Sequence, residues 1–159
     1  IEVGDRPTGT LVLDNLLPGK RLWCVATGTG LAPYLSIIRD PATFERFEQV
    51  IVTHTVRTTQ ELAYRELLSS LPITYYPTVT REPFTTEGRI TQRMDDGSLW
   101  DDLGLDPWNQ ACDRIMICGS PEFNNELRNR LQSEGFSHGT NRAAGHFVQE
   151  RAFVMQRVD

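Results

Sequence analysis

An apolar run, Arg21–Thr27, ends in Gly28-Thr29-Gly30 and leads into a segment with helical character, Gly30–Arg39. A parallel strand that passes through a Gly-x-Gly turn into a helix is a phosphate-binding geometry. The glycines let backbone amides approach a pyrophosphate, and the helix N-terminus offers unpaired N–H donors. The turn is not a Walker loop, since no Gly-Lys-Ser/Thr follows it. Pro33 stands where the usual dinucleotide fingerprint has its third glycine, so the turn alone does not identify the nucleotide.

Apolar runs and amphipathic segments alternate along the rest of the chain. This alternation predicts parallel strands joined by crossover helices, and right-handed crossovers fit the strand order 3-2-1-4-5. We therefore expect an α/β fold with a Rossmann-like open sheet of about five parallel strands and helices on both faces. The expected strands are Arg21–Thr27, Gln49–Val56, Ile73–Thr80, Arg114–Cys118 and Phe147–Val154, and the expected helices are Gly30–Arg39, Thr59–Leu71 and Pro121–Gln132.

Two of these helices carry start signals. Thr58 and Glu61 match a capping box, and Ser120 precedes Pro121 as an N-cap precedes a first-turn proline. The apolar stripes that follow predict buried faces, formed by Ala63, Leu67 and Leu71 in the first helix and by Phe123, Leu127 and Leu131 in the second. Elsewhere, Thr10–Leu13 resembles a short strand, and Arg89–Leu103 resembles short helical turns broken by Gly97 and Gly104.

The composition narrows the class of protein. A chain of 159 residues that is 39% apolar suits one compact domain, and a net charge of −5 argues against nucleic-acid binding. No apolar run is long enough to span a bilayer and no signal peptide is visible, so we expect no membrane partner. The three cysteines and three histidines show no metal-ligand spacing and no disulfide pattern, which favours a reducing cytoplasm and no metal.

The stretch "ATGTGLAPYL" resembles the nicotinamide-nucleotide loop of the ferredoxin–NADP reductase family, whose pattern is Thr-Gly-Thr-Gly-x-Ala-Pro. The bacterial ferredoxin/flavodoxin–NADP reductases are the most similar branch. Their later motifs recur here in order, as "HTVRTTQELAYR", "VTREP", "GRIT", "ICGSPEF" and "GHFVQERAFV". The resemblance covers nearly the whole chain. It implies that the NADP-binding residues are Thr27, Gly28, Thr29, Gly30, Arg57, Arg81, Arg89, Gly119, Ser120 and Pro121.

The arginines among these residues bear on the choice of nucleotide. A site that prefers NAD usually has an acidic residue at the end of strand 2, whereas this chain has Arg57 there. Arg81 ends strand 3, and neighbouring strand ends lie about 4.8 Å apart, so both side chains could reach one phosphate, with Arg89 returning from the next loop. Each arginine alone would be an ordinary surface residue. Together, and matching the family's 2′-phosphate site, they predict roughly a hundredfold preference for NADPH over NADH.

The second glycine loop and the last strand are expected to hold the reacting groups. The resemblance implies that Cys118 lies beside the nicotinamide and that Glu150 lies near the site of hydride transfer. It also implies that Ala152 faces the isoalloxazine, that Phe153 contacts the adenine end of FAD, and that Met155–Asp159 is a short tail. From the residues alone, Cys118 could equally be a small buried residue at a strand end, and Phe153 an ordinary core aromatic.

The family's flavin-binding motif, Arg-x-Tyr-Ser/Thr, and its antiparallel barrel are not in this sequence. We therefore expect residues 1–19 to be the end of a flavin domain or an inter-domain linker, and residues 20–159 to be an NADP-binding domain. The resemblance implies one half of a ferredoxin/flavodoxin–NADP reductase that uses NADP(H) and FAD. Its partners would be its own FAD-binding domain and ferredoxin or flavodoxin. We expect the chain to be a monomer that is inactive without the FAD domain.

Two other readings stay open at this point. One is the reductase half of an oxygenase or a flavohaemoglobin, which shares the fold and the Gly-x-Gly loop. The other is a non-catalytic NADP-binding module used for sensing or regulation. An upstream flavin-binding barrel would distinguish a reductase from a sensor.

Overall fold

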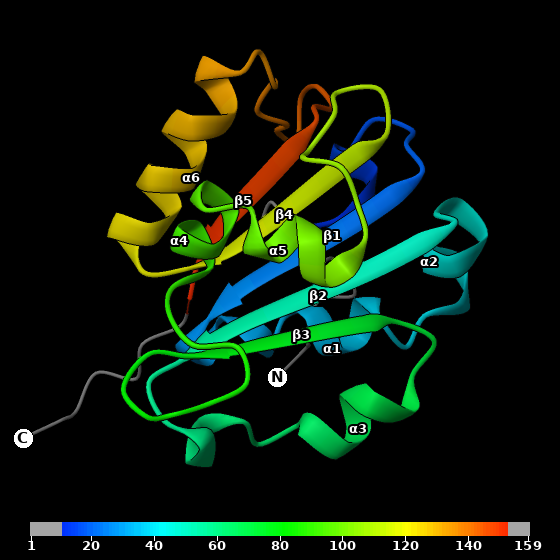
Figure 1. The fold of residues 1–159 in the computed structure, drawn as a ribbon. Coiled ribbons are helices and arrows are strands. Elements are labelled where there is room, and N and C mark those ends of the chain that lie inside the picture. Colours follow the sequence, from blue (N-terminus) through cyan, green and yellow to red (C-terminus); the bar gives the residue numbers. More distant parts are fainter. Residues whose placement is uncertain (1–10, 153–159) are drawn as a thin grey trace, which may run out of the picture.

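The computed structural model describes residues 11–152, which form a five-stranded sheet with helices on both faces (Figure 1). All pairs of neighbouring strands are parallel, and the order is β3-β2-β1-β4-β5, as predicted. The predicted bounds are confirmed for β1 and β2, differ by one residue at each end for β3 and β4, and extend past the observed end of β5. The strands are β1 (Arg21–Thr27), β2 (Gln49–Val56), β3 (Thr74–Val79), β4 (Asp113–Gly119) and β5 (Phe147–Arg151).

The central strand β1 and its neighbour β4 are mostly apolar after their first charged residues, because helices cover both of their faces. Residues 22–26 of β1 are at most 1% exposed, and every residue of β4 is buried. Parallel strands that are buried on both faces have continuous apolar sequences rather than alternating ones. This explains why these segments could be recognised as strands from their apolar runs.

Two sets of helices cover the sheet. Figure 1 shows α1, α2 and α3 on one face and α4, α5 and α6 on the other, and each set packs on its own apolar cluster. The helices are α1 (Tyr34–Ile37), α2 (Pro41–Arg46), α3 (Arg65–Ser70), α4 (Ile90–Asp95), α5 (Ser98–Leu103) and α6 (Pro121–Ser133), with 3-10 turns η1 (Leu13–Asn15), η2 (Gly28–Leu31) and η3 (Thr59–Glu61). No helix within residues 11–152 has the length and apolar character needed to cross a bilayer.

The start and buried face of α6 are confirmed. The Ser120 hydroxyl accepts a hydrogen bond from the Phe123 amide at 3.3 Å, and Pro121 occupies the first turn. Leu127 and Leu131 are buried, as the stripe predicted. The turns expected in Arg89–Leu103 are also confirmed, since α4 and α5 are separated by Gly97 and followed by Gly104, both with positive φ.

Two predicted helices are wrong in detail. The segment Gly30–Arg39 contains only part of η2 and the four-residue α1. The segment Thr59–Leu71 is broken between η3 and α3, because Leu62 has a non-helical backbone with φ −84° and ψ 54°. A helical period counted from Thr59 therefore does not continue into α3.

The break in this segment changes which side chains face the core. Leu62 and Leu68 are buried, whereas Ala63 is exposed and Leu67 and Leu71 are only partly buried. The sequence analysis also missed α2, although it has a recognisable start. The Asp40 carboxylate accepts a hydrogen bond from the Ala42 amide at 3.0 Å, directly before Pro41.

The segment before β1 is not a strand in its described part. Leu13 begins η1, and the amide of Leu17 donates to the carbonyl of Gly145 at 2.9 Å. Leu11 and Leu16 are buried in the core cluster shared with α1, α2 and α3. Over its described residues, 11–13, the expected strand is wrong, because Leu11 is buried in the core within an irregular segment that leads into η1.

Candidate nucleotide-binding site

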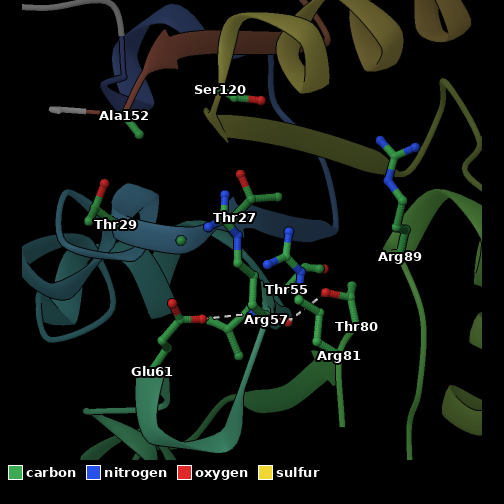
Figure 2. Close-up of a pocket in the computed structure, with 12 residues that line it drawn as sticks. Thr27, Thr29, Thr55, Arg57, Glu61, Thr80, Arg81, Arg89, Ser120 and Ala152 are labelled. Carbon is green, nitrogen blue, oxygen red and sulfur yellow. Dashed lines mark hydrogen bonds between the residues drawn. The ribbon is translucent and has the colours of Figure 1, made fainter.

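A pocket of about 490 Å³ lies at the carboxyl edge of the sheet (Figure 2). Its lining residues come from the ends of β1, β2 and β3, from the loops that follow them, and from the ends of β4 and β5. Open parallel sheets bind ligands at this edge, beside the point where the strand order reverses, which here lies between β1 and β4. The lining residues are Thr27, Gly28, Thr29, Thr55, Val56, Arg57, Glu61, Thr80, Arg81, Arg89, Ser120 and Ala152.

The pocket brings together most of the residues named from the sequence. Gly30, Cys118 and Gly119 are buried behind its wall. Pro121 and Glu150 line a neighbouring pocket of about 160 Å³. Phe153 and Met155–Asp159 lie outside the described residues. The sequence analysis did not assign Thr55 and Thr80 to the site, although both lie at or next to the ends of predicted strands.

The two glycine loops are in direct contact at the switch point. A Cβ atom on Gly30 would lie 2.0 Å from the carbonyl oxygen of Cys118, so only glycine fits there. A Cβ atom on Gly119 would lie 2.4 Å from the Thr27 hydroxyl oxygen. Gly28 has φ +53°, a left-handed conformation that favours glycine. The glycines therefore serve both the turn and the close approach of β1 to β4.

Arg57 and Arg81 are held side by side by the backbone. The Arg81 amide donates to the Arg57 carbonyl at 2.9 Å, and the Thr80 amide donates to the Val56 carbonyl at 3.0 Å. These bonds continue the pairing of β2 and β3 beyond the strand ends. Figure 2 shows both arginine side chains in the middle of the pocket, with Arg89 standing apart from them.

The carboxylates near these arginines are bonded to backbone amides. Glu61 accepts from the amides of Arg57 and Thr58, at 2.8 and 3.2 Å. Glu82 accepts from the amide and the hydroxyl of Thr59, at 3.2 and 3.1 Å. Within residues 11–152, neither Arg57 nor Arg81 forms an ion pair. Two exposed guanidinium groups thus stand in one pocket with uncompensated positive charge, which suits a phosphate.

Arg89 is arranged differently from the other two arginines. Its guanidinium forms an ion pair with Glu126 of α6, with Nη2 and Oε2 2.8 Å apart. Both side chains are substantially exposed, at 53% and 44%. Arg89 lines the pocket, but in this structure its charge is shared with a carboxylate on a different element.

Where β4 and β5 end, the structure brings together Cys118, Glu150 and Ala152, the three residues expected near the nicotinamide. Cys118 is the register partner of Glu150, and the Ala152 amide donates to the Gly119 carbonyl at 3.0 Å. Burial, and to a lesser degree the charge of Glu150, raises the pKa of the Cys118 thiol to about 11. Cys118 is therefore a protonated thiol at neutral pH, which excludes it as a thiolate nucleophile.

One contact to the first loop was not foreseen from the sequence. His54 of β2 is buried, and its Nε2 atom lies 2.7 Å from the carbonyl oxygen of Gly28. Sequence reasoning treated His54 as isolated, because no metal-ligand or catalytic pattern surrounds it. Its position in β2, two residues before the strand end, was a usable signal once β1 and β2 were predicted to be neighbours.

Comparison with known proteins identifies the family. The model of the oxidoreductase NAD-binding domain matches residues 24–129. Ferredoxin–NADP reductase A of Sorangium cellulosum is 45% identical over 99% of this chain and 61% of its own length. The ferredoxin–NADP reductase of Pseudomonas aeruginosa is 47% identical over 96% of this chain and 64% of its own.

Among solved structures, a ferredoxin NADP⁺ reductase from Neisseria gonorrhoeae with bound FAD and NADP has a TM-score of 0.83 and 30% sequence identity, covering 92% of this chain and 61% of that one. The chain thus spans about three fifths of the length of the relatives it matches. The resemblance that the motifs indicated is confirmed. By its sheet order, its glycine loops and its match to the family model, the chain belongs to the oxidoreductase NAD-binding domain family.

Proposed function

We propose that this chain is the NADP(H)-binding half of a ferredoxin/flavodoxin–NADP reductase. In this proposal residues 20–159 form the NADP-binding domain and residues 1–19 belong to its junction with a flavin domain. The observation that carries the proposal is the convergence of Arg57, Arg81 and Arg89 with the first glycine loop on one pocket. Three arginines from three separate segments suit the ribose 2′-phosphate that distinguishes NADP from NAD.

The residues of the pocket fit the parts of such a nucleotide. Charge-assisted bonds from two arginines would favour NADP over NAD by roughly a hundredfold, after allowance for their exposure. Glu61 lines the same pocket, but two backbone amides already bind its carboxylate. The backbone amides of Thr27–Gly30, together with Gly119, Ser120 and Pro121, would hold the pyrophosphate.

Ala152 would form the wall beside the nicotinamide, with the buried Cys118 behind it and Glu150 at its edge. When bound, the nicotinamide exchanges a hydride at its C4 atom with FAD, which the companion domain would supply. The neutral thiol of Cys118 would limit how the ring sits, and the small side chain of Ala152 would leave room for it. The Glu150 side chain would lie at the edge of the site, next to Pro121. Phe153 is proposed to contact FAD, by the match of its motif alone.

The activity of the whole protein would combine this domain with an FAD-binding domain and a small electron carrier. Hydride transfer needs donor and acceptor atoms near contact distance, so positioning is the contribution proposed for this chain. The names of its relatives support ferredoxin or flavodoxin as the carrier. On this proposal the chain alone binds nucleotide without turnover, and electron transfer requires the flavin domain.

The rival readings differ in the arginines and in the companion domain. The reductase half of an oxygenase or a flavohaemoglobin would share the glycine loop but would not need three arginines in this pocket. A non-catalytic NADP-binding module would share the arginines but not a flavin-binding barrel. Calorimetry of the nucleotide site therefore tests the first rival, and the domain that precedes this one in the full-length protein tests the second.

The test is calorimetric titration of this chain with 2′,5′-ADP and, separately, with 5′-AMP. We expect binding of 2′,5′-ADP to be at least about tenfold tighter, because only this ligand carries the 2′-phosphate. Arg57→Ala and Arg81→Ala should each remove most of that difference. Arg142→Ala is the matched control, because Arg142 is exposed and does not line the pocket. Equal affinity for the two ligands in a folded sample would overturn the proposed 2′-phosphate site.

A further inference from the structure

His54 lies beneath the first glycine loop. It is 2% exposed, and as the register partner of Ala26 it stands two positions before the level of Gly28. From there its ring reaches the loop, with Nε2 2.7 Å from the Gly28 carbonyl oxygen. A side chain of β2 is thus bonded to the backbone of the turn that follows β1.

The chemistry of this contact determines which ring nitrogen carries the proton. A carbonyl oxygen only accepts, so Nε2 must be the donor. Burial lowers the pKa of His54, which keeps the ring neutral and leaves Nδ1 without a proton at neutral pH. Nδ1 is buried and has no hydrogen-bond partner within residues 11–152. A buried imidazole with one unpaired nitrogen is less favourable than an apolar side chain of similar size, so packing alone does not explain the bond to Gly28.

A role for this bond follows from the planarity of the peptide bond. The Gly28 carbonyl and the Thr29 amide belong to one trans peptide, so they point in opposite directions. Fixing the carbonyl toward His54 therefore fixes the Thr29 N–H in the direction away from His54. Gly28 has φ +53°, a conformation that glycine adopts with little strain, and it begins the short 3-10 turn η2. The contact with His54 adds a side-chain restraint to the backbone of that turn.

The pocket linings are consistent with this assignment. Gly28 and Thr29 both line the arginine pocket, whereas His54 does not. His54 lines a second pocket of about 380 Å³ with Leu31 and Tyr64, and Gly28 and Thr29 line that pocket as well. The histidine therefore contacts the loop without occupying the arginine pocket.

We infer that His54 is a positioning residue that orients the Gly28–Thr29 peptide so that the loop's amide donors face the pyrophosphate of the bound dinucleotide. This inference rests on the proposed NADP-binding function. It adds that the pyrophosphate part of the site depends on β2, while the 2′-phosphate part depends on the arginines. The two parts can be separated by comparing NADP⁺, which carries both groups, with a ligand that carries the 2′-phosphate alone.

The experiment compares His54→Leu and His54→Gln in calorimetric titrations with NADP⁺ and with 2′-AMP. Leucine fills a similar volume without a donor, while the glutamine amide can still donate to Gly28. NADP⁺ contains the pyrophosphate, whereas 2′-AMP carries the 2′-phosphate alone. We expect His54→Leu to bind NADP⁺ about tenfold more weakly and 2′-AMP within about twofold of the parent chain. His54→Gln should stay within about threefold of the parent chain for both ligands.

A matched control comes from the same strand. Thr53 is also buried, at 1% exposed, and its hydroxyl has no hydrogen-bond partner among residues 11–152, so it forms no bond to the glycine loop there. Thr53→Val should leave both affinities unchanged. Nuclear magnetic resonance of the histidine rings gives a second readout, because it distinguishes the two neutral tautomers. We expect His54 to carry its proton on Nε2.

Each outcome supports or contradicts the inference. Equal NADP⁺ affinity in His54→Leu and the parent chain would overturn it, as would a proton on Nδ1. A parallel loss of both ligands in His54→Leu would indicate general destabilisation and would also count against it. So would a His54→Gln variant as weak as the leucine variant. If the parent chain binds neither NADP⁺ nor 2′-AMP, the proposed function itself fails, which is a distinct result.

Discussion

Arg81 donates its backbone amide hydrogen to the carbonyl oxygen of Arg57 across 2.9 Å, just beyond Val56 and Val79, the last paired residues of β2 and β3. The sheet itself therefore sets the spacing of the two arginine side chains. Because parallel strands end at the same edge, residues that are 24 positions apart in the sequence meet at one pocket. This relationship makes the two arginines a pair, and it predicts how they respond to substitution.

The first prediction concerns nucleotide preference. In the double variant Arg57→Ala/Arg81→Ala, the preference for NADP⁺ over NAD⁺ should fall from roughly a hundredfold to less than about fivefold, because the positive charge around the 2′-phosphate is lost. Affinity for NAD⁺ should change little, since it has no 2′-phosphate. Competitive titration of the two dinucleotides measures the ratio. An unchanged ratio in the double variant would mean that the arginines do not contact the 2′-phosphate.

The second prediction concerns the contact between the glycine loops. In Gly30→Ala, the new methyl group would meet the Cys118 carbonyl at 2.0 Å, and backbone cannot move aside as a flexible side chain can. We expect the free energy of unfolding to drop by about 3 kcal/mol or more, with loss of nucleotide binding. Gly28→Ala is the comparison. It meets no atom within 4 Å and should cost only about 1–2 kcal/mol for its positive φ. Chemical denaturation measures both, and equal stability of the two variants would contradict the close approach.

The third prediction concerns Arg89 and Glu126. If Arg89 binds the 2′-phosphate, then Glu126 competes with the phosphate for the same guanidinium group. Glu126→Gln should therefore tighten binding of 2′,5′-ADP by about twofold to fivefold at low ionic strength, with a smaller effect at high salt. Binding of 5′-AMP should not change. In an Arg89→Ala background the gain should disappear, and a gain that persists there would assign the effect to Glu126 alone.

The fourth prediction concerns the thiols. Burial raises the pKa of Cys118 to about 11 and raises that of Cys24 further, whereas Cys112 is partly exposed. Because a raised pKa lowers the thiolate fraction, at pH 8 only roughly one Cys118 molecule in a thousand would be a thiolate. A disulfide reagent should then titrate one of the three cysteines in the folded chain and all three after denaturation. Cys112→Ser should abolish the fast reaction, and rapid modification of Cys118 would contradict its burial.

The strands and their order could be predicted because burial on both faces produces continuous apolar runs. For β1 and β2 the runs even marked the correct ends. The start of α6 was equally readable, since its Ser-Pro signal is local in sequence. The meeting of Arg57 and Arg81 was predictable for a related reason. Once the strand order is known, the residues that follow neighbouring strands must meet at one edge of the sheet.

The helices α1, α2 and α3, which cover one face of the sheet, were harder to predict. They depend on contacts that the local sequence does not encode. The segment Thr59–Leu71 has a helical pattern, but the chain breaks at Leu62, so that Leu62 and Leu68 are buried instead of the predicted stripe. A short break of this kind costs little in local propensity. Packing against the sheet therefore decides which leucines are buried.

By itself, the sequence determined the parallel sheet, the two glycine loops and the group of arginines, because periodicity, turn residues and strand ends are local properties. Only the tertiary structure decided which distant side chains contact these loops and arginines. The bond from His54 to Gly28 and the ion pair from Arg89 to Glu126 join residues 26 and 37 positions apart. Such contacts form only after the strands and helices have packed, so their partners are set by three-dimensional proximity and by the exclusion of water between them.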